Sequence, residues 1–65
     1  MYLLCLEQDG KMYLWQGGGY FTLNIKQAKR YPTWEVASQW CSRIKRWSLK
    51  YMSEEDYQDW LEERQ

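Results

Sequence analysis

The sequence predicts one small α+β domain, in which an antiparallel three-stranded sheet is followed by two helices packed on one of its faces. A chain of 65 residues has room for a single core. Its hydrophobic content of 45% is too high for a disordered segment. Apolar alternation with period two in the first third gives way to helical periodicity in the second half. Residues 1–65 therefore form a single predicted domain.

Strands are expected at about residues 2–7, 12–16 and 20–24. Asp9-Gly10 between the first two is typical of a type I′ hairpin turn, which needs positive φ at both central residues. Alternating side chains make both faces of this hairpin apolar. Because two short helices can cover only one face, we expect the other face to bind a partner or a second copy of the chain, with Tyr13 and Trp15 as contacts.

The connection after the hairpin contains Gly17-Gly18-Gly19, which we interpret as a flexible link between strands. A phosphate-binding loop would need a following Lys-Ser or Lys-Thr and a helix, and aromatic strand residues follow instead. Residues 24–30 are expected to form a short helical turn that ends before Tyr31-Pro32, because a residue preceding proline avoids the α region.

Two helices are expected at about residues 34–50 and 54–64, with Thr33 and Ser53 as N-caps. The apolar side of the first consists of Val36, Ala37, Trp40, Cys41, Ile44, Trp47 and Tyr51. An alternative ends this helix near Arg46 and makes residues 47–51 a short strand. The apolar side of the second helix consists of Tyr57, Trp60 and Leu61.

A family resemblance rests on the segment from Tyr20 to Thr33, which reads YFTLNIKQAKRYPT and is followed by Ala37. This segment, with the preceding Asp-Gly-Lys-Met-Tyr hairpin, resembles small proteins of unknown function encoded by bacteriophages and prophages. The resemblance covers roughly the first forty residues. It implies an N-terminal hairpin leading into helices, and a phage setting, but no particular chemistry.

The composition argues against an enzyme and against a metal or cofactor site. The chain has no histidine, which removes the commonest general base and metal ligand. Cys5 and Cys41 match no zinc or redox spacing, and we expect two buried free thiols. The uncharged start, Met1 to Leu6, is too short for a signal peptide or a membrane span, so we expect a cytoplasmic protein without membrane contact.

The formal net charge is zero, yet charge is unevenly distributed. Residues 26–50 contain seven basic side chains and one acid, whereas residues 51–65 contain six acids and one base. Four acids share the side of the second helix opposite its apolar side, where like charges repel by roughly a few tenths of a kcal/mol each. These are Glu55, Asp59, Glu62 and Glu63. They either contact a basic partner surface or keep an aromatic-rich protein in solution.

Arg43, Arg46 and Lys50 form a basic row on the first predicted helix. The row is suited to nucleic-acid phosphates, or to pairing with the acids of the second helix if the two helices are neighbours. The net charge of zero disfavours nucleic-acid binding. Such binding is driven by the release of counterions from the nucleic acid, which requires a surplus of positive charge on the protein.

We therefore predict a non-enzymatic protein-binding module. It is expected to occupy a surface on a host protein, for example a CRISPR-type defence nuclease, in the cytoplasm of a bacterial host. The predicted contacts are Glu55, Asp59, Glu62, Glu63, Tyr13 and Trp15. The alternative is a small protein that binds single-stranded nucleic acid through its sheet aromatics and the row Arg43, Arg46 and Lys50.

Overall fold

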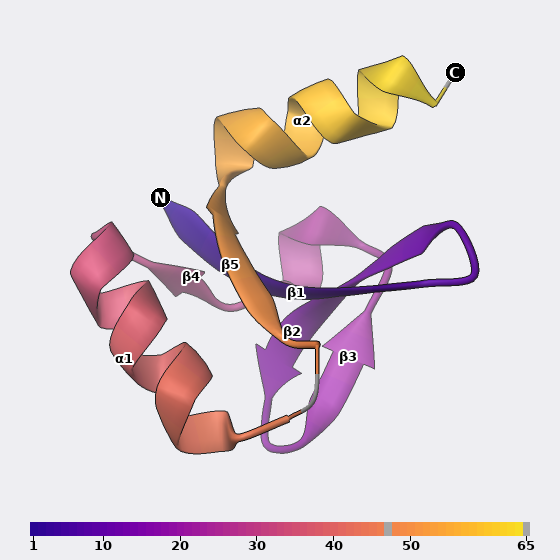
Figure 1. Cartoon of the computed structure of the whole chain (residues 1–65). Coiled ribbons are helices and arrows are strands. Elements are labelled where there is room, and N and C mark those ends of the chain that lie inside the picture. Colours follow the sequence, from indigo (N-terminus) through magenta and orange to yellow (C-terminus); the bar gives the residue numbers. More distant parts are fainter. Residues whose placement is uncertain (47, 65) are drawn as a thin grey trace.

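The computed structural model of the chain describes residues 1–46 and 48–64, and Figure 1 shows their arrangement. The fold is α+β, as predicted. Its elements in chain order are β1 (Tyr2–Gln8), β2 (Lys11–Gly17), β3 (Tyr20–Thr22), a short 3-10 helix (Ile25–Gln27), β4 (Arg30–Tyr31), α1 (Trp34–Ile44), β5 (Lys50–Ser53) and α2 (Glu54–Glu63).

Two tight turns build the first part of the sheet. Asp9 and Gly10 have φ values of 55° and 77°, the signs that a type I′ turn requires. The two-residue loop sets the register of the hairpin, in which Leu6 pairs with Tyr13. Gly18 and Gly19 also have positive φ, and they join β2 to β3 as an ordered two-residue turn. The three-glycine segment is therefore a connection between strands, as expected.

The sheet has five strands, not the predicted three, and β1 lies at its centre. Leu3 pairs with both β4 and β5, and Cys5 pairs with both β2 and β5. Because a strand has two edges, β2 and β4 share one edge of β1 and β5 occupies the other. The preferred prediction lacked β4 and β5, which have two and four residues and are too short to show clear alternation. The alternative strand at residues 47–51 overlaps β5 at residues 50–51.

Each face of the sheet is covered by its own helix, so the prediction of two helices on one face is wrong. Leu3 and Cys5 of β1 pack with Tyr57 of α2. Leu4 points to the other face and belongs to the core that includes Ala37 of α1. Figure 1 shows α1 and α2 apart, with β1 and β5 between them. A hairpin that is apolar on both faces is thus covered on both within one chain.

The first helix is shorter than predicted, and the competing interpretation of its end was the better one. α1 ends at Ile44 because Lys45 adopts the left-handed conformation, with φ 54°. The chain then turns into β5 instead of continuing as helix to residue 50. Trp47, which the helical pattern placed on the apolar side, lies outside the described residues.

The predicted caps are confirmed at both helices. The Thr33 side chain accepts a hydrogen bond from the Val36 amide at 3.3 Å, and Ser53 accepts one from the Asp56 amide at 3.1 Å. Each cap satisfies an amide that has no partner within its helix. The Ser53 cap sets the start of α2 directly after β5, which determines which side of α2 faces the sheet.

Candidate functional site

The outer side of α2 carries the four acids singled out from the sequence. Tyr57, Trp60 and Leu61 pack toward the sheet, as predicted, so the opposite side faces solvent. We call that side the acidic ridge, and all of its residues are exposed: Glu55, Asp59, Glu62 and Glu63. A shallow depression of about 340 Å³ lies on this helix, lined by Glu54, Glu55, Gln58 and Asp59.

No carboxylate of the acidic ridge forms an ion pair with any residue that the structure describes. The neighbouring Glu54 does, since its Oε1 accepts a hydrogen bond from Arg30 Nε at 2.6 Å. The two helices are not neighbours, because they lie on opposite faces of the sheet. Basic side chains of α1 therefore do not pack against the acidic ridge. The acidic ridge therefore has no internal counter-charge from α1.

The predicted basic row is divided among three places. Arg43 lies on α1, Arg46 follows the end of that helix, and Lys50 lies in β5. Lys50 Nζ is 3.8 Å from Glu7 Oε1, and Glu7 Oε2 also accepts from Arg64 at 3.0 Å. The three residues do not form one row, because the prediction required a helix that continues to residue 50. Of these three residues, Arg43 and Arg46 form no ion pair with a described residue.

Tyr13 and Trp15 are half-buried on the α1 side of the sheet. Trp15 packs within the core under α1, and its ring meets that of Phe21 edge-on at a centroid distance of 5.4 Å. The expectation of an uncovered aromatic sheet face is therefore corrected. The largest exposed aromatic side chains lie elsewhere, on β3, α1 and β5: Tyr20, Trp34, Trp40 and Tyr51.

Cations and aromatic rings meet on the α1 side, in contacts that the sequence analysis did not predict although it had named Arg43 and Arg46. Lys29 Nζ lies 5.5 Å from the ring centroid of Trp40, and Arg43 Cζ lies 5.3 Å from the same centroid. Arg46 Cζ lies 5.1 Å from the centroid of Phe21. The i, i+3 spacing of Trp40 and Arg43 could have indicated this contact, but Trp40 was assigned to the buried side of the helix.

The two thiols are separated by the sheet. Cys5 belongs to the core under α2 and Cys41 to the core under α1, and both are free. Burial raises the pKa of Cys5 from 9.0 to about 11, and burial also raises the pKa of Cys41. The Cys41 Sγ donates to the Leu49 carbonyl at 3.3 Å. Thiols with raised pKa values are poor nucleophiles at neutral pH.

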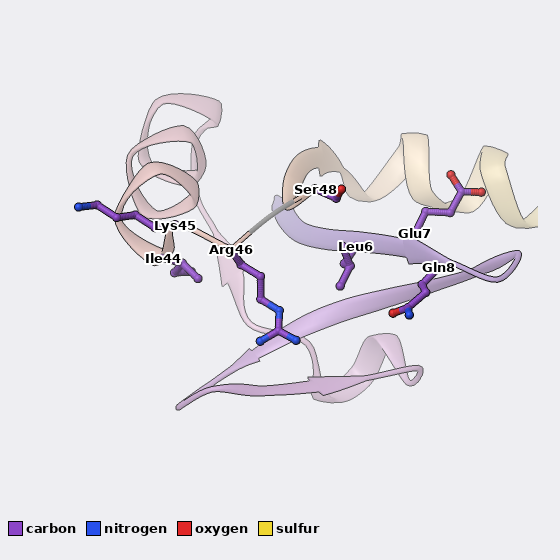
Figure 2. Close-up of a pocket in the computed structure, with 7 residues that line it drawn as sticks. All are labelled: Leu6, Glu7, Gln8, Ile44, Lys45, Arg46 and Ser48. Atoms are coloured by element: carbon purple, nitrogen blue, oxygen red, sulfur yellow. The ribbon is translucent and has the colours of Figure 1, made fainter.

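A pocket of about 630 Å³ lies between the end of α1 and the last residues of β1 (Figure 2). Its described lining is Leu6, Glu7, Gln8, Ile44, Lys45, Arg46 and Ser48. Figure 2 shows Arg46 reaching from the end of α1 toward the strands, whereas Lys45 points away. Glu7 is its one lining acid among the described residues, and Lys50 and Arg64 already pair with it.

Within residues 1–46 and 48–64, no three side chains of the metal-binding types cluster closely enough to hold an ion. No helix in this part of the chain has the length and apolar character needed to span a membrane.

Comparison of the chain with protein families, curated proteins and solved structures gives no match. The resemblance to small phage proteins stays a prediction.

Proposed function

We propose that the protein is a binding module without catalytic activity, and that the acidic ridge of α2 occupies a basic surface on a host protein. The observation that carries this proposal is the absence of ion pairs at Glu55, Asp59, Glu62 and Glu63 among the described residues. Glu62 and Glu63 also lie at the C-terminal end of the helix, where the helix dipole disfavours negative charge. A basic partner surface would offset both the repulsion among these carboxylates and their unfavourable interaction with the helix dipole.

The kind of partner follows from the spacing of the charges. Carboxylates along one side of a helix resemble the phosphates of a nucleic-acid strand in sign and in linear arrangement. A protein with a groove for nucleic acid therefore offers a complementary surface, and charge complementarity would accelerate the encounter. The phage setting implied by the N-terminal resemblance favours a host defence nuclease, such as a CRISPR-type enzyme, as this partner.

The test compares wild type with a ridge variant carrying Glu55→Gln, Asp59→Asn, Glu62→Gln and Glu63→Gln. Partners are captured from a bacterial lysate on each immobilised protein, identified by mass spectrometry and then titrated in purified form. We expect the ridge variant to bind the identified partner at least about tenfold more weakly, which is about 1.4 kcal/mol. Its thermal unfolding should remain cooperative, because the four side chains lie outside both cores.

Glu62→Gln and Glu35→Gln provide a matched pair of single variants. Both remove one exposed carboxylate from a helix, but Glu35 lies on α1, on the other side of the sheet. Weaker binding should follow from Glu62→Gln alone. If the ridge variant binds the partner as tightly as wild type at low salt, the acids only solvate the helix and the proposal fails.

A further inference from the structure

Three exposed cations on the α1 side of the sheet lie over aromatic rings and have no carboxylate partner among the described residues: Lys29, Arg43 and Arg46. Arg30, Lys50 and Arg64 pair with carboxylates, whereas Lys11, Lys26 and Lys45 have neither a carboxylate partner nor a ring contact among the described residues. The only acid of α1 is Glu35, eight residues before Arg43 and thus about 12 Å away along the helix axis. The three cations are therefore available to an external anion.

Aromatic rings lie directly beside these cations. The ring of Trp40 is 39% exposed and has both Lys29 and Arg43 within 5.5 Å of its centroid. The ring of Phe21 is half-exposed and lies beneath Arg46, which Figure 2 shows extended over the strands. A cation over the face of a half-exposed ring brings positive charge and aromatic surface together at one place.

Trp15 joins the two groups into one surface. Its backbone carbonyl accepts a hydrogen bond from the Lys29 amide at 2.9 Å, and its ring packs against Phe21. The two groups are together called the basic–aromatic surface, which consists of Phe21, Lys29, Trp40, Arg43 and Arg46. It lies across the sheet from the acidic ridge, so opposite charges on this molecule do not cancel locally.

We propose that the basic–aromatic surface binds single-stranded nucleic acid, a ligand separate from the protein partner of the acidic ridge. Exposed rings stack on unpaired bases, and interleaved cations follow the phosphates of the strand. A duplex hides the faces of its bases, so the rings would gain nothing from it. Zero net charge does not oppose this binding, because the acids lie mainly on the far side.

The ligand is tested directly with a short fluorescein-labelled oligothymidine, the matching oligouridine and a duplex of equal length. Fluorescence anisotropy at salt concentrations between about 50 and 200 mM should show single-strand binding with a Kd on the order of 10 µM at low salt. Three phosphate contacts predict a slope of log K against log salt of about −2. Binding of either single strand satisfies the proposal, and the two arms identify whether the 2′-hydroxyl contributes.

Paired variants locate the surface. Trp40→Ala should weaken binding about tenfold, whereas Trp34→Ala, which removes a 53% exposed ring from the same helix, should change it less than about twofold. Arg43→Gln and Arg46→Gln should each make the salt slope shallower by about 0.7. Lys50→Gln removes an equal charge that is paired with Glu7, and should leave the slope unchanged.

Thermal unfolding of each variant separates loss of binding from loss of fold. If Trp40→Ala does not fold, Trp40→Phe and the two arginine variants decide, because they keep a ring at position 40.

No binding to either single strand at low salt overturns the proposal, as does equal affinity for the duplex. Equal effects of Trp40→Ala and Trp34→Ala, or of Arg43→Gln and Lys50→Gln, overturn it as well. The ridge variant should bind oligonucleotide normally, so failure here is distinct from failure of the protein-binding proposal.

Discussion

The thiol of Cys5 illustrates how the fold changes the chemistry of a single residue. Its side chain is fully buried in the centre of β1, among the apolar residues under α2. Desolvation by burial disfavours the thiolate and raises the pKa to about 11, while the Lys50 charge opposes that rise. A residue that is reactive in many proteins is therefore a small hydrophobic core residue here.

This shift predicts that the free energy of unfolding falls as pH rises through the window from about 9 to about 11. In that window the unfolded chain releases the Cys5 proton and the folded chain retains it, so alkaline pH favours unfolding. The stabilisation is fully present below pH about 9, and the loss from this group is at most about 2.7 kcal/mol. Urea unfolding at a series of pH values measures the slope.

The control for this prediction is Cys5→Ala, which keeps a small apolar side chain at the site. Its unfolding free energy should be less dependent on pH, although Cys41 and the buried Tyr31 and Tyr57, whose pKa values burial also raises, leave a residual slope. An identical slope in wild type and variant would show that Cys5 does not titrate differently in the two states.

At the scale of elements, the end of α1 determines the rest of the fold. Lys45 and Ser48 both have positive φ, and the chain between Ile44 and Lys50 reverses into β5. Neither residue is a glycine, so each carries the steric cost of a side chain in the left-handed region. The reversal is what allows β5 to pair with the second edge of β1 and α2 to cover the second face.

Replacing Lys45 tests this backbone cost. Lys45→Gly should be more stable than Lys45→Ala by about 1 kcal/mol, because glycine adopts positive φ without a Cβ clash while alanine does not. Both substitutions remove the same exposed charge, which isolates the backbone effect. Denaturant unfolding gives the difference. Equal stabilities would mean that residue 45 does not hold the left-handed conformation in solution.

The elements that the sequence predicted best are those with strong local signals. Asp9-Gly10 determines a turn, while Thr33 and Ser53 cap helices, and all three were confirmed. The end of α1 lacks such a signal, since no glycine or proline follows Ile44 and the apolar pattern continues with helical period. Strand β5 was missed because its formation depends on pairing with β1, which is distant in the sequence.

The candidate site followed the same division. The acidic ridge depends on one helix and its period, so its exposed residues were correctly placed from sequence. The basic–aromatic surface combines β3, the residue before β4, α1 and the turn after it, and only the tertiary fold brings Lys29 to Trp40 and Phe21 to Arg46. Lys50 was included for its helical spacing and lies instead beside Glu7.

At the scale of the whole molecule, the sheet separates two charged sides. Basic segment 26–50 supplies α1 and its flanks, and acidic segment 51–65 supplies α2, on opposite faces. Each core is formed by one helix against one face, so the charged outer side of each helix is not required for packing. Two separate ligands are thus compatible with one small domain.

The central claim is that the acids at the end of α2 serve binding and oppose folding. The most direct measurement is the free energy of unfolding of the double variant Glu62→Gln and Glu63→Gln at low salt. We predict an increase of about 0.5 kcal/mol, from relief of charge repulsion and of the unfavourable helix dipole, that diminishes at high salt. Glu54→Gln, which loses the pair with Arg30, should lower stability instead. A decrease for the double variant would contradict the claim, because it would show that these carboxylates stabilise the fold from within.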